Sequence, residues 1–259
     1  MPAAAYTRDV SDASAEATGG RQARWEPHNA ERRARIIAAA IELVEESVPG
    51  AAISSQQIAD RSGLAKSVLY RQFSGRDELD RRVRSEIAAR FTDALDTALD
   101  IADGSIARIV ARAVGVVVDW IGDHPRLHEC LRGGPAADDP VDRDALTGLL
   151  AAITDRAARL VTGLAGVVGV ADPPVIDTMT FAIVSMTEAT VTRWARDPDP
   201  ALSRGALIAE IASYAWSILD GVSRAHGIVL DPNQPLLELL DDLATPVPDQ
   251  AARRSGSLR

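Results

Sequence analysis

Residues 53–79 read ISSQQIADRSGLAKSVLYRQFSGRDEL, and this stretch decides the fold of the N-terminal part of the chain. It holds two short helix patterns joined by a tight turn at Ser62-Gly63, then an aromatic residue, Phe73, and the start of a new helix. This layout predicts a helix-turn-helix, whose second helix enters the major groove of DNA. Lys66, the one lysine among 28 Lys and Arg residues, lies at the start of that second helix.

The charges of the chain are unevenly distributed. Residues 21–90 carry 13 basic and 10 acidic side chains, a net of +3, whereas residues 91–259 carry 14 and 24, a net of −10. With −2 from residues 1–20, the whole chain has a formal net charge of −9. A basic N-terminal part on an acidic body predicts one module that faces DNA and a remainder that faces away from it.

The length and composition indicate a folded protein of one large domain or two smaller ones, because 46% of the 259 residues are hydrophobic. A single cysteine, Cys130, excludes an intramolecular disulfide. The N-terminus lacks the apolar stretch of a secretory signal. No apolar run approaches the roughly 18–20 residues that span a bilayer. We therefore expect a cytoplasmic protein that does not bind membranes.

Apolar residues recur at helical spacing, and alternating strand patterns with hairpin turns are missing, so we predict an all-α fold. A short helix capped by Ser54 or Ser55 is expected first in the motif. Residues 1–28 are expected to form a disordered tail, residues 29–76 the helix-turn-helix domain, and residues 246–259 a second disordered tail. The other helices are expected over residues 30–47, 64–73, 76–100, 105–122, 125–132, 141–168, 173–196, 200–226 and 236–243.

Residues 58–79, IADRSGLAKSVLYRQFSGRDEL, resemble the N-terminal signature of the tetracycline-repressor (TetR) family of bacterial transcription regulators. The family signature usually runs IA…AGVSxGTLYxxFxSKEEL. The departures are Ala65 for Ser, Ser67 for Gly, Val68 for Thr and Arg76 for Lys. The change to Val68 removes a hydroxyl that bonds a phosphate in the family. The matching residues are Ile58, Ala59, Gly63, Leu69, Tyr70, Phe73, Ser74, Glu78 and Leu79.

The resemblance is specific over residues 31–85 and weaker beyond them, where it rests on length, helix count and the WARDPDP element at residues 194–200. It implies that residues 77–245 form a helical ligand-binding and dimerisation domain. It also implies double-stranded DNA, a second copy of the chain and a small-molecule effector as partners.

The residues expected to contact DNA lie at the start of three helices. Ala65 and Ser67 are small enough for a close approach to the major groove. Arg71 suits a bidentate contact to guanine or is a solvated charge, and Lys66 suits a phosphate better than a base. Tyr70 resembles the family tyrosine that binds a phosphate, the alternative being a core position. Further phosphate contacts are expected from residues at two helix N-termini, namely Ser55, Gln56 and Arg76.

Large apolar and a few polar side chains in the acidic body are candidates for a ligand cavity, which the resemblance implies. Such residues at helical spacing usually form core, which is the alternative. A largely apolar pocket predicts a hydrophobic or amphipathic ligand such as a lipid-like acid, an aromatic compound or a drug. The expected ligand-binding residues are Trp120, His124, Met179, Met186, Thr187 and Trp194.

The segment from His124 to Cys130 contains His, His, Glu and Cys, all able to bind metals. Pro125 suits the first position of a helix, which makes His124 a cap residue. Cys130 suits an apolar filling position. We therefore predict neither a metal site nor a cofactor.

The resemblance places the dimer interface on the helices expected over residues 173–196 and 200–226, as a four-helix bundle about a two-fold axis. The alternative is that the apolar stripe of the second helix faces its own body. The stripe consists of Ile208, Ile211, Ala212, Ala215, Trp216 and Leu219.

We predict a homodimeric, ligand-responsive DNA-binding regulator, a repressor that a small, largely apolar molecule releases from a palindromic operator. An activator and a ligand-independent regulator are alternatives. No catalytic triad order, glycine-rich phosphate loop or zinc spacing is present in the sequence, so an enzyme is not predicted. A DNA-independent helical interaction scaffold is the alternative from another class.

Overall fold

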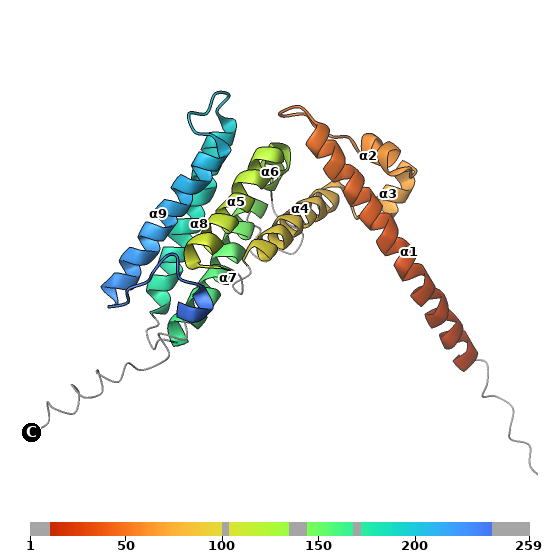
Figure 1. Cartoon of the computed structure of the whole chain (residues 1–259). Helices are drawn as coiled ribbons and strands as arrows, with labels where there is room; N and C mark the ends of the chain where they lie inside the picture. The colour runs from red at the N-terminus through yellow and green to blue at the C-terminus, as the bar shows by residue number, and fades with distance from the viewer. Residues whose placement is uncertain (1–10, 100–103, 135–143, 168–171, 240–259) are drawn as a thin grey trace, which may run out of the picture. The chain divides into compact units, whose positions relative to one another are not determined.

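The computed structural model describes residues 11–99, 104–134, 144–167 and 172–239, and helices dominate all four ranges. The only β pairing within them is an isolated antiparallel bridge between Ser105 and Pro235, which confirms the all-α prediction. The helices are α1 (Ser11–Glu46), α2 (Ser55–Ser62), α3 (Lys66–Gln72), α4 (Arg76–Ala98), α5 (Ile106–Asp123), α6 (Pro125–Leu131), α7 (Ala145–Val167), α8 (Pro173–Arg196) and α9 (Arg204–Ala225) (Figure 1).

Two compact units make up the chain, Met1–Val83 and Arg84–Arg259. The boundary lies inside α4, whereas the sequence analysis placed it at the start of that helix, after Arg76. No local signal marks the observed boundary, because α4 continues through it as an unbroken helix.

Helix α1 begins at Ser11, so the disordered tail expected over residues 1–28 is wrong from residue 11 onward. Residues 11–26 are rich in Ala, Glu, Gln and Arg, which have high helix propensity. The disordered tail was expected because these residues are polar, and their helix propensity was given too little weight. The tail expected over residues 246–259 lies outside the described residues.

Within the first unit, α2 and α3 both pack against α1 and against each other (Figure 1). The core is made of fully buried side chains from each helix, including Ile36 and Ile41 of α1, Ile58 of α2 and Leu69 of α3. Phe73, at the C-terminal end of α3, is 4% exposed. These apolar contacts hold the helix-turn-helix on the long first helix.

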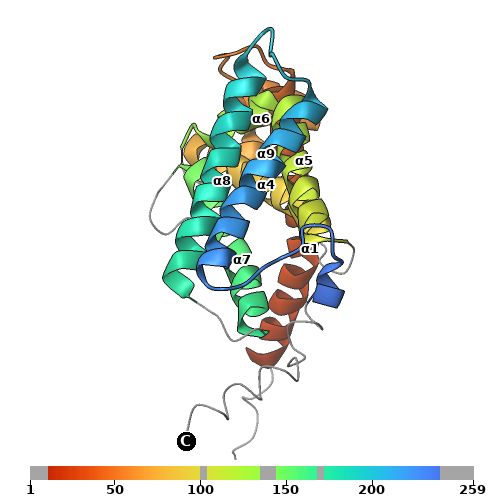
Figure 2. The same ribbon diagram turned by 60° about the vertical axis from the view of Figure 1, so that its left-hand side comes forward.

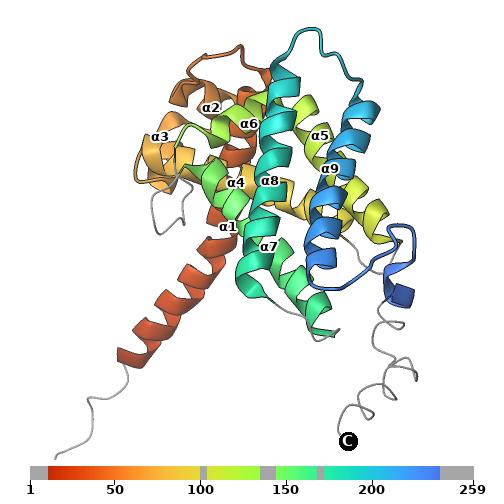
Figure 3. The same cartoon turned by 90° about the vertical axis from the view of Figure 1, so that its left-hand side faces the viewer.

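Within the second unit, α8 and α9 run side by side, with α5 against both and α7 against α8 (Figures 2 and 3). Helix α9 begins at Arg204 instead of residue 200, because the Ser203 hydroxyl caps it by accepting from the Ala206 N–H at 3.3 Å. The helix expected over residues 236–243 is observed over its described part, residues 236–239. Among the described residues, no helix is both long and apolar enough to cross a membrane.

Candidate DNA-binding surface and ligand cavity

Ser54 and Gly63 set the two ends of α2. The Ser54 hydroxyl accepts from the Gln57 N–H at 3.2 Å, while the Gln57 side chain accepts from the Ser54 N–H at 2.8 Å, which forms a capping box. At the other end Gly63 has φ +65°, a conformation that favours glycine. The Ser62-Gly63 turn was therefore predicted correctly, and it connects α2 to α3.

Polar contacts from α1 fix α2 and α3 in place. Arg35 Nη2 donates to the Ser62 carbonyl at 2.7 Å, and Arg33 Nε donates to the Gln72 carbonyl at 3.2 Å. Both carbonyls lie at helix C-termini, where backbone acceptors lack partners within the helix. These two arginines therefore orient the helix-turn-helix.

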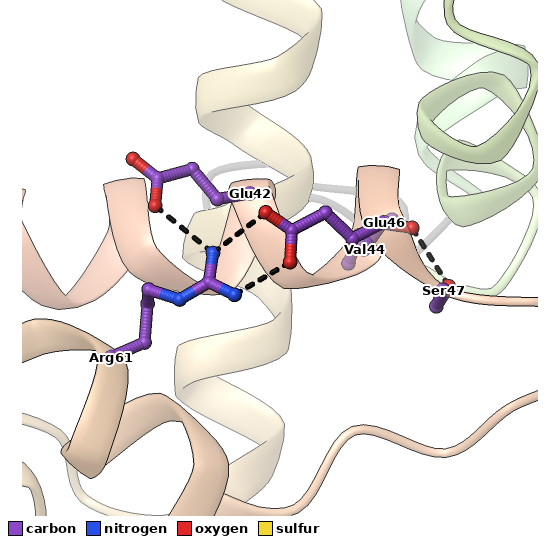
Figure 4. A network of polar contacts seen from close by, with 5 residues as sticks. All are labelled: Glu42, Val44, Glu46, Ser47 and Arg61. Atoms are coloured by element: carbon purple, nitrogen blue, oxygen red, sulfur yellow. Dashed lines mark hydrogen bonds and ion pairs between the residues drawn. The ribbon is translucent and has the colours of Figure 1, made fainter.

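Arg61 of α2 adds an ion-pair cluster with two glutamates of α1 (Figure 4). Its Nη1 and Nη2 donate to the two Glu46 oxygens at 2.9 and 2.5 Å, and Nη1 also lies 3.3 Å from Glu42 Oε2. Nearby, Ser47 Oγ donates to the Val44 carbonyl at 2.7 Å, at the end of α1 (Figure 4). The hydrogen bond to Arg61 lowers the pKa of Glu46. The sequence analysis missed this cluster, since its members are far apart in sequence.

The outward face of α3 carries the residues expected to read DNA. Ala65, Lys66, Ser67, Tyr70 and Arg71 are all exposed, whereas Leu69 of the same helix is fully buried. Tyr70 is 48% exposed, which excludes the alternative of a core position. Its hydroxyl donates to Ser55 Oγ at 3.3 Å, so the hydroxyl lies at the first residue of α2.

Lys66 and Arg71 differ from the other cations of this unit. Arg33, Arg35, Arg61 and Arg76 each donate to protein carbonyls or carboxylates. In the described part of the chain, no acceptor lies within hydrogen-bond distance of Lys66 or Arg71. These two side chains are therefore free to bind an anion outside the protein.

Arg76 has a structural role that the sequence analysis did not predict. Its Nη1 donates to the Ile53 carbonyl at 2.7 Å, and its Nε lies 2.8 Å from both Asp80 carboxylate oxygens. It therefore ties the start of α4 to the segment before α2. Gln56 is exposed and donates to Asp60 at 2.8 Å, so it keeps a solvent-facing position on α2.

The second unit contains a partly open apolar cavity of about 340 Å³, lined by residues of α4, α5, α6, α7, α8 and α9 and of the segment after α9. Three of the expected ligand-binding residues line it, namely Trp120, Met179 and Thr187. Leu95, Val117, Leu160 and Leu219 are typical of the rest of the wall. A cavity of this size and polarity is suited to a small apolar molecule.

The other three expected ligand-binding residues do not line this cavity. Met186 and Trp194 pack against an apolar cluster around Val191 and Ile211 instead, and Trp194 Nε1 donates to the Leu202 carbonyl at 2.8 Å. His124 occupies the junction between α5 and α6, as the cap residue of both. Helical periodicity places Met186 and Trp194 on apolar helix faces. It does not distinguish a side chain that packs against the core from one that lines a cavity.

One end of the cavity is polar. Glu188 of α8 and His128 of α6 both line it, with His128 Nε2 3.2 Å from Glu188 Oε1. The same oxygen accepts from Arg132 at 2.6 Å and from Thr192 at 2.9 Å. His128, Thr192 and Arg132 together lower the pKa of Glu188 to about 2, so it is a carboxylate at neutral pH. Glu188 was not among the ligand-binding residues expected from the sequence.

Four of the six residues in the apolar stripe expected at the dimer interface, Ile208, Ile211, Ala215 and Leu219, face the body of their own chain. Ile211 and Ala215 are 0% and 1% exposed, and Ala215 and Leu219 line the cavity. Ile208 packs against the apolar cluster, and Ala212 and Trp216 are half-buried. The exposed large side chains of the two helices are instead Phe181 of α8, at 58%, and Tyr214 of α9, at 50%.

No group of three or more metal-binding side chains occurs among the described residues. Glu129, within the segment that suggested a metal site, forms an ion pair with Arg126, and His128 lies beside Glu188. Cys130 is half-buried and forms no disulfide.

No protein-family model matches the chain. In sequence it is similar to HTH-type transcriptional regulators from two strains of Mycobacterium tuberculosis. Each is 24% identical over 218 residues, which cover 81% of this chain and 86% of the relative.

Solved structures have a similar fold. A TetR-family transcriptional regulator from Streptomyces coelicolor matches with a TM-score of 0.59 and 20% identity, over 88% of this chain and 98% of that one. The fatty acid degradation regulator FadR from Bacillus halodurans matches with a TM-score of 0.53 and 16% identity, over 71% of this chain and 94% of that one.

The fold is that of a protein with a helix-turn-helix and a helical body. The resemblance to the TetR family that residues 58–79 indicated is confirmed, because this chain has the fold of TetR-family transcriptional regulators.

Proposed function

We propose that this protein is a homodimeric DNA-binding transcription regulator, a repressor whose DNA binding responds to a small, largely apolar molecule. The observation that carries the proposal is the exposed face of α3, where Lys66, Tyr70 and Arg71 have no core role. Lys66 binds a phosphate, Arg71 reads a base edge, and the Tyr70 hydroxyl binds a phosphate beside Ser55.

Dimerisation uses the outward faces of α8 and α9, where Phe181 and Tyr214 are exposed. Ala182, Ala189 and Ser217 are small exposed residues of the same two helices and permit close helix approach, while the exposed charged residues Asp177 and Glu210 lie one turn before Phe181 and Tyr214. A two-fold dimer presents two copies of α3, so the operator is a pseudo-palindrome with half-sites about one helical turn of DNA apart.

Helix α4 supports a coupling between effector and DNA. It belongs to both units, and its second half contributes Phe91 and Leu95 to the cavity wall. A molecule that binds the cavity more tightly in one setting of α4 shifts the population toward that setting. Release from DNA follows if that setting is the one that binds DNA less well.

The experiment is a selection of genomic fragments by the purified protein, with a variant carrying Lys66→Ala and Arg71→Ala alongside. We expect the wild-type protein to enrich a palindromic motif and the variant to enrich none. A folded dimer that enriches no fragment would overturn the proposal and favour the DNA-independent scaffold. If the variant still enriches the motif, α3 is not part of the DNA-binding surface.

A further inference from the structure

The two carboxylate oxygens of Glu188 differ in their polar contacts with the described residues: one has several and the other has none. Oε1 receives the contacts from His128, Arg132 and Thr192, at 3.2, 2.6 and 2.9 Å. Within the part of the chain that the structure describes, no donor lies on Oε2. The side chain lines the cavity and is 13% exposed, and Oε2 is an acceptor with open lone pairs.

Aromatic rings gather at the same end of the cavity. The rings of Phe91 and Trp120 lie 4.9 Å apart at 64°, and those of Trp120 and His128 lie 6.4 Å apart at 82°. All three residues line the cavity together with Glu188. A carboxylate beside aromatic rings is a setting in which organic cations bind, by charge and by attraction to ring faces.

Besides Glu188, the polar residues of the lining are His128, Thr180, Thr187 and Ser223. The hydroxyls of Thr180 and Thr187 donate to carbonyls one turn earlier in α8, at 2.9 and 2.8 Å. Arg132 lies outside the cavity lining and forms an ion pair with Glu188 through Oε1. A ligand carboxylate at this end would face the Glu188 carboxylate, and like charges close together in an apolar cavity are destabilising.

We propose that the cavity binds an apolar molecule with a protonated amine head group, whose N–H donates to Glu188 Oε2 beside the Trp120 ring. This inference depends on the proposed function only where it calls the ligand an effector. It predicts a cationic ligand, in place of the lipid-like acid considered from the sequence. The apolar tail extends along the wall formed by residues such as Leu95, Leu160 and Leu219.

The test is calorimetric titration of the full-length protein, without DNA, with decylamine, decanol and decanoate below their micelle concentrations. The three probes share one tail and differ only in the head group. We expect one decylammonium per chain to bind at least tenfold more tightly than decanoate, with decanol between them. In Glu188→Gln this preference falls to within about twofold, because the amide lacks the negative charge.

Glu129→Gln is the matched control, since it removes the same charge from an exposed position on α6. It should leave the preference unchanged, which separates binding at Glu188 from general attraction to a chain of net charge −9. Equal or tighter binding of decanoate, no binding of any probe, or an amine preference that survives in Glu188→Gln would each overturn the proposal. The wild-type series decides even where Glu188→Gln does not fold. Because DNA is absent, failure here leaves the DNA-binding proposal to its own test.

Discussion

At the scale of single residues, Tyr70 shows how exposure and bonding separate a functional role from a packing role. Its ring is half exposed and its hydroxyl lies at the start of α2. Tyr70→Phe removes only the hydroxyl, so we predict about tenfold weaker operator binding, since a hydrogen bond to a charged group contributes about 1.5–3 kcal/mol. Fluorescence anisotropy measures this.

Thr97→Val serves as the control for that variant, because it also removes one hydroxyl from an exposed side chain, but Thr97 lies on α4 in the second unit. It should bind DNA as the wild-type protein does. An equal loss of operator affinity in both variants would mean that the Tyr70 hydroxyl makes no specific contact with DNA.

Lys66 gives a second prediction at this scale, through its charge. Each phosphate contact by a cation releases condensed counterions, so Lys66→Ala should reduce the slope of log K against log salt by about 1. Arg159→Ala removes an exposed cation from α7 and should leave the slope unchanged. An unchanged slope in Lys66→Ala would show that the lysine does not contact phosphate.

Glu188 gives a prediction about pH. Its pKa in the folded protein is lowered from 4.5 to about 2 by His128, Thr192 and Arg132. A lowered pKa contributes stability that is present above pH 4.5 and is lost as the pH falls toward 2. Glu188→Gln should therefore lower the free energy of unfolding by about 1–3 kcal/mol at pH 7. The difference from wild type should shrink between pH 4.5 and 2, as measured by urea unfolding, and a difference that stays constant over this range would contradict the role of its charge.

At the scale of secondary-structure elements, local signals explain which boundaries could be predicted. Pro173, at the start of α8, and Gly63, at the end of α2, act through their own backbone, so the sequence alone located both. The start of α9 was misplaced because Ser203, not Pro200, caps it.

Contacts between elements were not predictable in the same way. Arg61 with Glu46, and His128 with Glu188, join residues that are far apart in sequence. Each depends on how two helices pack, and a single sequence has no local pattern for that. The same limit explains why Met186 and Trp194 were expected in the cavity but lie in the core.

The capping box of α2 gives a prediction at the element scale. Ser54→Ala removes the hydroxyl that accepts from the Gln57 N–H, so the free energy of unfolding should fall by about 1 kcal/mol. Ser67→Ala is the matched control, because Ser67 is an exposed serine within α3 that does not cap a helix. Chemical unfolding compares the two, and equal losses would argue against the cap.

At the scale of the whole molecule, the dimer depends on the outward faces of α8 and α9. Phe181→Asp places a charge on the proposed interface, twice in a two-fold dimer, so the dimer dissociation constant should rise at least tenfold. Val229→Asp is the control, because Val229 is 68% exposed but lies beyond α9. Sedimentation velocity over a concentration series measures both. A dimer that survives Phe181→Asp would place the interface elsewhere.

The most direct test of the central claim, that the exposed face of α3 binds DNA, is fluorescence anisotropy on DNA from upstream of the gene for this protein over a salt series. We predict tight wild-type binding that weakens steeply with salt. The variant with Lys66→Ala and Arg71→Ala should lose about two units of that slope and most of its affinity. Binding with the wild-type slope in this variant would contradict the account.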